Sequence, residues 1–496
     1  MPQTNADSAA RIWSAVAVSF RPSRVDVLAL AVLLLGLAGG LWLYAGRSPA
    51  DPDRHFHFAL ARTWAENGMP KTLPQVEGIG WNVAFVDKEF LFHVVTWLGW
   101  LVGERAGVIA SSAVLAALIL SLLYVLARQF LGARESVLAV VAGVSCPMFL
   151  YRLVLVRPHL LAIAATLLLL VGLTRTSWKV TFAAGLLFAL GYHALYIPAA
   201  VLGLAFVLQG RSAWRAVGAG VGGLVLGTVI NPYFPGTLET TWMTLTIAAS
   251  KPSGNTFGGE LFPIQPHEFL GAYRVPVVMF VVSAVLALLS RGTSGSRLRF
   301  MLVATAGLFW VLCLRSARAS EYAIPLTIAA FASVSNSLPP MVLSLGLALG
   351  LVLNVPLLRD SAQVTQLDRY TMHIADAVDA LPKEAAGQKV LNCTFPEGEV
   401  LLDRRPDVRF VDVLDPTFLE RFDKDRHQAR LLLINGEARD VRDIVTVTFG
   451  AQYVICGYPQ AKRLLDDNPD FVRLRPPPGP PLPPGSGPSV YEVRRR

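Results

Sequence analysis

The chain has 496 residues, of which 53% are hydrophobic and only 16% are charged, and its net charge is +9. This composition excludes an ordinary soluble protein and indicates a polytopic membrane protein that carries some soluble mass. The positive charge does not indicate nucleic acid binding, because much of it lies in short loops between hydrophobic segments, where Lys and Arg set the orientation of spans. We therefore expect membrane lipids around the chain and no nucleic acid partner.

The hydrophobic segments lie between residues 25 and 358, a region that we interpret as the transmembrane domain. About 20 apolar residues in a helix cross a hydrocarbon core of ~30 Å. Residues 1–24 are expected to be a cytoplasmic tail, followed by an uncleaved anchor, since no small-residue cleavage site is present. We predict about eleven spans, near residues 25–44, 106–127, 136–151, 158–173, 179–192, 194–209, 215–230, 275–290, 298–314, 322–338 and 340–358.

The basic residues of the connecting loops predict the topology. With a cytoplasmic N-terminus, most of the cytoplasmic loops carry two or more Lys or Arg, as the positive-inside rule requires. The long loop 45–105, the segment 231–274 and a C-terminal domain at 359–496 then lie outside the cytoplasm, on the outer face of a bacterial-type inner membrane. Acidic residues and histidines outside the basic loops gather on that same face.

A short polar segment opens the first outer loop and holds four titratable side chains, Asp51, Asp53, His55 and His57. A helix is expected over residues 53–67, ended by Gly68. On this helix Asp53 and His57 are four residues apart and face the same way, and Asp51 and His55 form a second such pair if the helix begins early. A membrane anchor needs few such residues, so the clustering indicates chemistry.

A second polar cluster follows in the same loop, with Asp87 and Glu89 separated by one residue. It precedes an amphipathic stretch at residues 90–101 that is expected to lie along the membrane interface. The two acids are interpreted either as further carboxylates of the same site or as a solvated loop.

Four arginines on the predicted outer face run against the positive-inside rule: Arg152, Arg157, Arg315 and Arg318. Two arginines at a membrane boundary suit the planar, bidentate recognition of a phosphate. The simpler interpretation of the first pair is snorkelling to the lipid headgroups. For the second pair it is a salt bridge with Glu321, which follows at helical spacing.

The last part of the chain alternates between short apolar runs and helical patterns. Strands are expected at residues 387–393, 408–412, 431–434 and 452–456, with helices near 362–382, 416–428, 437–447 and 459–467. Such alternation predicts a small α/β domain with a mainly parallel sheet. Cys393 and Cys456 each end a strand, and a disulfide between them is left open because sequence gives no distance.

Together these motifs resemble the GT-C superfamily of polytopic glycosyltransferases, which use polyprenyl-phosphate-linked sugars. The segment from Asp53 to Ala61 resembles the acidic start of the family's first outer loop, followed by Gly68-Met-Pro70, and Asp87-Lys-Glu89 resembles its second acidic element. The segment from Arg315 to Tyr322 resembles a late arginine-containing segment that meets the lipid phosphate in such enzymes. The C-terminal domain lacks a Trp-Trp-Asp signature, which argues against an oligosaccharyltransferase proper.

The resemblance implies a GT-C-like membrane domain, an α/β outer domain and transfer of a sugar to a glycan, lipid or protein acceptor. Asp53 is then the general base, or with Glu89 a ligand of a divalent cation such as Mg²⁺ or Mn²⁺, rather than a helix N-cap. Asp51, Asp87 and Glu89 are supporting carboxylates. His55 and His57 either lie on a solvated helix face or bind a metal. The preference of hard cations for oxygen ligands argues against the second alternative. The lipid phosphate would be held by Arg315, Arg318, Arg152 and Arg157, supported by Glu321 and Tyr322.

Two other classes of function are weighed against this one. A secondary transporter or lipid flippase would place its ionisable groups near the bilayer midplane, with an inverted repeat, whereas here they gather at one surface. A non-catalytic scaffold would leave the clustered acids and histidines without a role.

Overall fold

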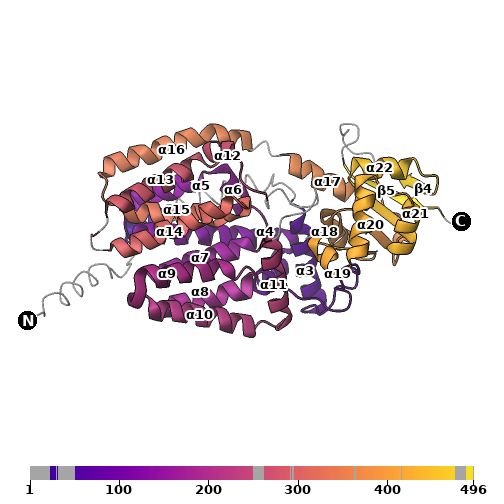
Figure 1. Cartoon of the computed structure of the whole chain (residues 1–496), viewed down its shortest axis with the longest axis horizontal. Helices are drawn as coiled ribbons and strands as arrows, with labels where there is room; N and C mark the ends of the chain where they lie inside the picture. The colour runs from indigo at the N-terminus through magenta and orange to yellow at the C-terminus, as the bar shows by residue number, and fades with distance from the viewer. Residues whose placement is uncertain are drawn as a thin grey trace, which may run out of the picture.

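The computed structural model of the chain describes residues 23–29, 31, 51–249, 262–290, 292, 295–361, 365–414, 416–474 and 487–494. A bundle of helices makes up most of the molecule, and a smaller domain with a β-sheet lies at one end of the bundle (Figure 1). Helix α3 (Asp53–Asn67) lies at the junction between the two parts.

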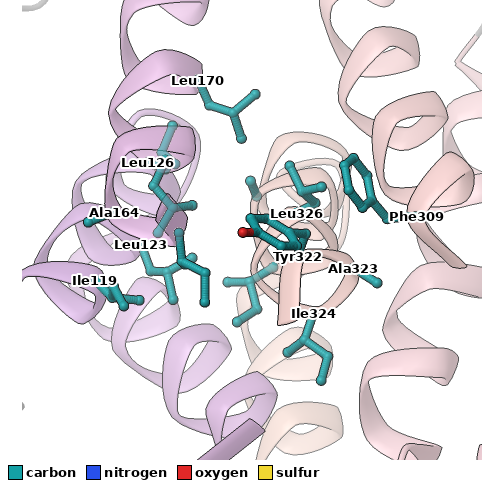
Figure 2. Packing of buried hydrophobic residues seen from close by; sticks show 14 of the residues in the cluster. Ile119, Leu123, Leu126, Ala164, Leu170, Phe309, Tyr322, Ala323, Ile324 and Leu326 are labelled. Atoms are coloured by element: carbon teal, nitrogen blue, oxygen red, sulfur yellow. The ribbon is translucent and has the colours of Figure 1, made fainter. Parts of the chain in front are cut away.

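The bundle is built from apolar helices whose buried faces form one continuous hydrophobic core. Figure 2 shows a part of it, where Tyr322 and Leu326 of one helix face Leu123 and Leu126 of another. The helices are α4 (Phe90–Arg128), α5 (Ala133–Val144), α6 (Pro147–Leu153), α7 (His159–Thr174), α8 (Trp178–Gly191), α9 (Tyr196–Gln209), α10 (Trp214–Val229), α11 (Gly236–Ala249), α12 (Pro266–Leu270), α13 (Arg274–Leu289), α14 (Ser296–Cys313), α15 (Ser320–Ser335) and α16 (Pro340–Ser361).

The prediction of about eleven spans is not confirmed. Among the described helices, α4 and α14 are long and apolar enough to cross a membrane, and α5 with α6, bent by 91°, would make a third. Shorter apolar helices such as α7 and α8 have 16 and 14 residues. At 1.5 Å per residue such helices are shorter than a hydrocarbon core of ~30 Å. Most of the first predicted span, 25–44, lies outside the described residues.

Helix α4 joins two predicted elements, the amphipathic stretch and the span that follows it. Its backbone leaves helical geometry at Gly103 and Glu104, where Glu104 has a φ of 49°. The two halves approach so closely that a Cβ on Gly99 would lie 2.5 Å from the carbonyl oxygen of Gly107. The first half therefore folds back on the second, and glycines at both positions allow this contact.

The C-terminal domain, which we call the outer domain after its predicted location, holds a five-stranded sheet in the order β2-β1-β3-β5-β4. Neighbours β2, β1 and β3 are parallel, whereas β5 pairs antiparallel with both β3 and β4. The sheet is thus mixed: β2, β1, β3 and β4 run in one direction, and the C-terminal strand β5 lies between β3 and β4 and runs in the opposite direction. The strands are β1 (Lys389–Asn392), β2 (Arg409–Phe410), β3 (Tyr453–Cys456), β4 (Phe471–Leu474) and β5 (Ser489–Val493).

One predicted strand is wrong, since residues 431–434 belong to helix α20 (Lys424–Asn435). Asp423 caps this helix by accepting a hydrogen bond from the backbone N–H of Arg426, and Gly436 ends it in the left-handed conformation. These end signals outweigh the short apolar run. The other helices are α17 (Thr365–Asp379), α18 (Phe395–Arg404), α19 (Pro416–Phe422), α21 (Val441–Asp443) and α22 (Pro459–Asp466).

A disulfide joins Cys393 and Cys456, whose Cα atoms are 5.0 Å apart. The two cysteines lie at the ends of the neighbouring parallel strands β1 and β3. The bridge that the sequence left open is therefore present, and it fixes the start of α18, which begins two residues after Cys393.

The part of the loop 45–105 that follows α3 packs into the hydrophobic core of the outer domain. Val76 pairs with Phe410 beside β2, and a Cβ on Gly78 would lie 2.5 Å from the carbonyl oxygen of Val411. Phe56 of α3 lies in the outer core, whereas Phe58 lies in the bundle core. Helix α3 is thus held from both sides, which fixes the position of its polar residues.

Candidate active site

The helix predicted at residues 53–67 is confirmed as α3, and Gly68 ends it with a φ of 74°. Its N-cap is Pro52, and no side chain caps it through a hydrogen bond. Neither acid of the segment therefore acts as the N-cap. The side chains of Asp51 and Asp53 are engaged elsewhere, with consequences for the chemistry of the site.

Three carboxyl groups meet around one arginine. Arg157 donates hydrogen bonds of 2.6 and 2.8 Å to the two oxygens of Asp51, and its Nε lies 3.0 Å from Asp53. Glu399, on helix α18, is fully buried and faces both aspartates. We call Asp51, Asp53, Arg157 and Glu399 the acidic cluster. Asp51 is also buried, but the side chain of Asp53 is 20% exposed.

A second group of polar residues lies one helical turn further along α3. His57 Nδ1 is 2.9 Å from His93 Nε2, and His93 Nδ1 is 2.7 Å from a carboxylate oxygen of Asp87. The other oxygen of Asp87 accepts a hydrogen bond of 2.8 Å from the backbone N–H of Glu89. We call His57, Asp87, Glu89 and His93 the histidine cluster, and all four side chains are buried.

The histidine cluster offers donor atoms for a metal ion. One atom each of His57, Glu89 and His93 lie within 4.8 Å of one another. Burial and the neighbouring His93 lower the pKa of His57 well below its usual value, so that His57 is neutral and able to ligate. Burial alone would raise the pKa of Glu89, but the charge of Lys88 and the contact with His193 lower it, so that Glu89 is ionised.

This donor set fits a divalent transition metal better than Mg²⁺, because two of the three donors are imidazoles. Asp87 would orient His93 from behind, as carboxylates commonly do for metal-bound histidines. Of the two acids predicted to bind a metal, Glu89 belongs to this group, whereas the structure pairs Asp53 with Arg157. The sequence signal for the two histidines was their helical spacing from acids: His57 follows Asp53 by four residues, and His93 follows Glu89 by four.

Two basic residues outside the histidine cluster lie close to Glu89. Lys88 lies 4.0 Å from Glu89, and His193, between α8 and α9, lies 3.5 Å from it. Burial and then the charge of Lys88 lower the pKa of His193 to about 4, with a further contribution from Arg318. Arg318, in the short helix Ala317–Ala319, is therefore close enough to His193 to lower its pKa.

The other predicted phosphate-binding and supporting residues are placed differently. Arg152 is buried and forms an ion pair with Glu321 of α15. Tyr322 is buried in the hydrophobic core, and its ring lies 5.6 Å from that of Phe309 (Figure 2). Arg315 is exposed just beyond the end of α14.

His55 connects α3 to the outer domain, although the sequence predicted a solvated or metal-binding side chain. It is buried, and its Nδ1 lies 2.6 Å from Asp403 of α18. Arg105 forms a second ion pair with Asp403 at 2.9 Å, and Arg62 donates to the carbonyl oxygen of the same residue at 2.9 Å. Helix α18 is therefore anchored on α3 by several charged and polar contacts.

No protein-family model and no curated protein matches the chain. Solved structures, however, share its architecture. The archaeal oligosaccharyltransferase AglB from Archaeoglobus fulgidus, in complex with an inhibitory peptide and a dolichol-phosphate, is 12% identical, with a TM-score of 0.59 over 88% of this chain and 70% of that one. ArnT from Cupriavidus metallidurans, bound to undecaprenyl phosphate, is 14% identical, with a TM-score of 0.57 over 93% of this chain and 97% of that one.

The chain has the GT-C fold. The resemblance to the GT-C superfamily seen in the sequence motifs is confirmed at the level of the fold. At these identities the similarity concerns the fold, so the roles of individual residues rest on the geometry described above.

Within the GT-C fold, the residues that sequence reasoning missed come from the outer domain. Glu399 and Asp403 are four residues apart on α18 and both are buried against α3. The available signal was two acids at helical spacing around an apolar run, directly after a Thr394–Glu397 capping box. That pattern indicates a polar helix face but not which part of the chain it meets.

Proposed function

We propose that this chain is a membrane glycosyltransferase that moves a sugar from a polyprenyl-phosphate-linked donor to an acceptor on the outer face of a bacterial-type inner membrane. The observation that carries the proposal is the position of Asp53. It is a partly exposed carboxylate in an otherwise buried polar site, one helical turn from a group of metal-binding atoms. The complexes of AglB with dolichol-phosphate and of ArnT with undecaprenyl phosphate support a polyprenyl-phosphate donor.

Asp53 has the properties that a general base for this reaction needs. An acceptor hydroxyl must lose a proton as the anomeric bond breaks, and a carboxylate within hydrogen-bond reach can accept it. Arg157 fixes the orientation of Asp53 and also holds Asp51, which leaves Asp53 as the more accessible of the two. A metal held by His57, Glu89 and His93 would supply electrostatic stabilisation of the departing phosphate.

The donor phosphate is expected at the basic side of Glu89. Lys88, His193 and Arg318 all act on this place, so an anion there would meet two permanent cations. Arg318 supplies a guanidinium fork, and Arg152 together with Glu321 would support it from the neighbouring helices. Arg157, by contrast, is committed to the acidic cluster. The predicted orientation, with residues 45–105 and 359–496 outside the cytoplasm, and the multi-pass topology are part of the proposal.

The proposal is tested with full-length protein in lipid nanodiscs and a panel of radiolabelled undecaprenyl-phosphate hexoses and pentoses. Wild-type protein is expected to release label from at least one donor. D53N should slow this by ~10²–10⁴, as loss of a general base does. Glu66→Gln is the matched control, because Glu66 is exposed on the same helix. Turnover of no donor, together with no thermal stabilisation by undecaprenyl phosphate beyond that of undecaprenol, would exclude the function. Full activity of D53N would exclude this residue as the base.

A further inference from the structure

Two acids on one face of helix α18 meet the polar segment of α3. Glu399 and Asp403 lie one helical turn apart, and the exposed fractions of the two residues are 0% and 1%. Thr394 and Glu397 form a capping box that starts the helix, and a Cβ on Gly398 would lie 1.9 Å from the carbonyl oxygen of Asp412. The helix is thus fixed at its N-terminal end, and both acids are held in place.

The surroundings of these two acids differ. Asp403 contacts His55 and Arg105, and Arg62 reaches it as well, so its charge is balanced. Neither oxygen of Glu399 accepts a hydrogen bond from any donor in the described part of the chain. Glu399 instead faces Asp53 and Asp51, and Arg157, the cation that acts on it, already binds both aspartates. A buried carboxyl group without a donor is not explained by docking of the helix.

Carboxyl groups that face one another in a buried site cannot all be ionised, and one of them keeps its proton. Asp51 and Asp53 are stabilised as anions by Arg157, so the proton belongs on Glu399. Burial and the charges of Asp53 and Asp51 raise the pKa of Glu399 well above its usual value, in agreement with this assignment. A neutral Glu399 has one O–H to donate, and Asp53 is the acceptor that faces it.

We propose that Glu399 is a positioning residue which the outer domain contributes to the site, and that its protonated carboxyl group orients the carboxylate of Asp53. The acidic cluster is then complete only when α18 is docked on α3. This inference rests on the proposed function in one respect, namely that Asp53 is the group whose orientation affects turnover. The protonated contact itself does not depend on any substrate.

The contact is tested first without substrate, by infrared spectroscopy of the full-length protein in nanodiscs at neutral pH. A protonated carboxyl group gives a C=O band that ionised carboxylates lack, and E399Q is expected to remove one such band. Glu397 is also expected to contribute, so E397Q is measured beside it. Glu437→Gln, at an exposed position of the same domain, should leave the spectrum unchanged. A spectrum of E399Q identical to that of the wild type would overturn the proposal.

The effect on turnover is tested with the donor that the wild type accepts. E399A is expected to lower kcat by ~10–100-fold with little change in KM for the donor, the loss expected for one hydrogen bond to a charged group. E399Q should restore most of this rate, because its amide N–H replaces the O–H. Equal loss in both variants, or none in E399A, would contradict a positioning role. If the wild type turns over no donor, the proposed function fails, while the infrared band still decides the state of Glu399.

Discussion

Helix α3 holds two polar clusters that are assembled in different ways. The histidine cluster is built from residues 57–93, a single stretch of 37 residues that includes the loop and the start of α4. The acidic cluster joins Asp51 and Asp53 to Arg157, more than 100 residues later, and to Glu399 in the outer domain. The members of one cluster therefore come from a single loop, whereas those of the other come from three distant parts of the chain.

The two clusters also differ in how the charges of their carboxyl groups are balanced. In the histidine cluster each carboxyl group has a histidine of its own as partner, since Asp87 contacts His93 and Glu89 contacts His193. In the acidic cluster three carboxyl groups share one guanidinium, and an excess of acids is tolerated only because Glu399 keeps a proton. We therefore expect that the candidate metal-binding part and the proton-accepting part of the proposed site can be disturbed separately.

The largest effect on one cluster alone is expected from D403N, which removes the charge that anchors α18 on α3. Asp403 is buried and meets His55, Arg62 and Arg105, and loss of such contacts costs about 2–3 kcal/mol. The midpoint of thermal unfolding should therefore fall, and turnover should fall with it because Glu399 is displaced. Scanning calorimetry of the nanodisc-embedded protein measures the first effect.

The metal affinity of the same variant tests whether the two clusters are independent. The affinity of D403N for Mn²⁺ or Zn²⁺, measured by titration calorimetry, should stay within about twofold of the wild type, since distant sites act nearly independently. A large loss of metal affinity would show that both clusters depend on docking of the outer domain.

D87N is expected to have a smaller effect, and to disturb the histidine cluster while it leaves the acidic cluster unchanged. Asp87 binds His93 at 2.7 Å and would orient it as a metal ligand, and loss of such a partner typically costs 10–100-fold in metal affinity. Titration calorimetry with Mn²⁺ and Zn²⁺ measures this loss, and the infrared band of Glu399 should stay unchanged. Wild-type metal affinity in D87N would mean that the histidine cluster is not the metal site.

The smallest effect concerns Glu397, which belongs to neither cluster. Burial raises its pKa to about 8 from 4.5, although backbone hydrogen bonds oppose the shift. Between these two pH values the folded state binds more protons than the unfolded state, so stability declines as the pH rises through this window. In E397Q the midpoint of thermal unfolding should fall less steeply over the same range. An unchanged slope would mean that Glu397 does not titrate there.

Local sequence determined the parts of the site that depend on neighbouring residues. Pro52 and Gly68 bound α3, and the spacing of Asp53 and His57 puts them on one face of it. The end signals at Asp423 and Gly436 are also local, and they determine α20 in spite of the apolar run at 431–434. These features follow from hydrogen bonding and periodicity over a few residues.

Only the tertiary structure decided which distant charges meet. Arg157 and Arg152 look alike in the sequence, yet one binds Asp51 and the other Glu321. Glu399 carries no local sign of a role, because its effect arises from facing Asp53 across a domain boundary. The physical reason is that a buried charge is governed by what lies within a few ångströms of it, and the packing of α3 between two hydrophobic cores sets those neighbours.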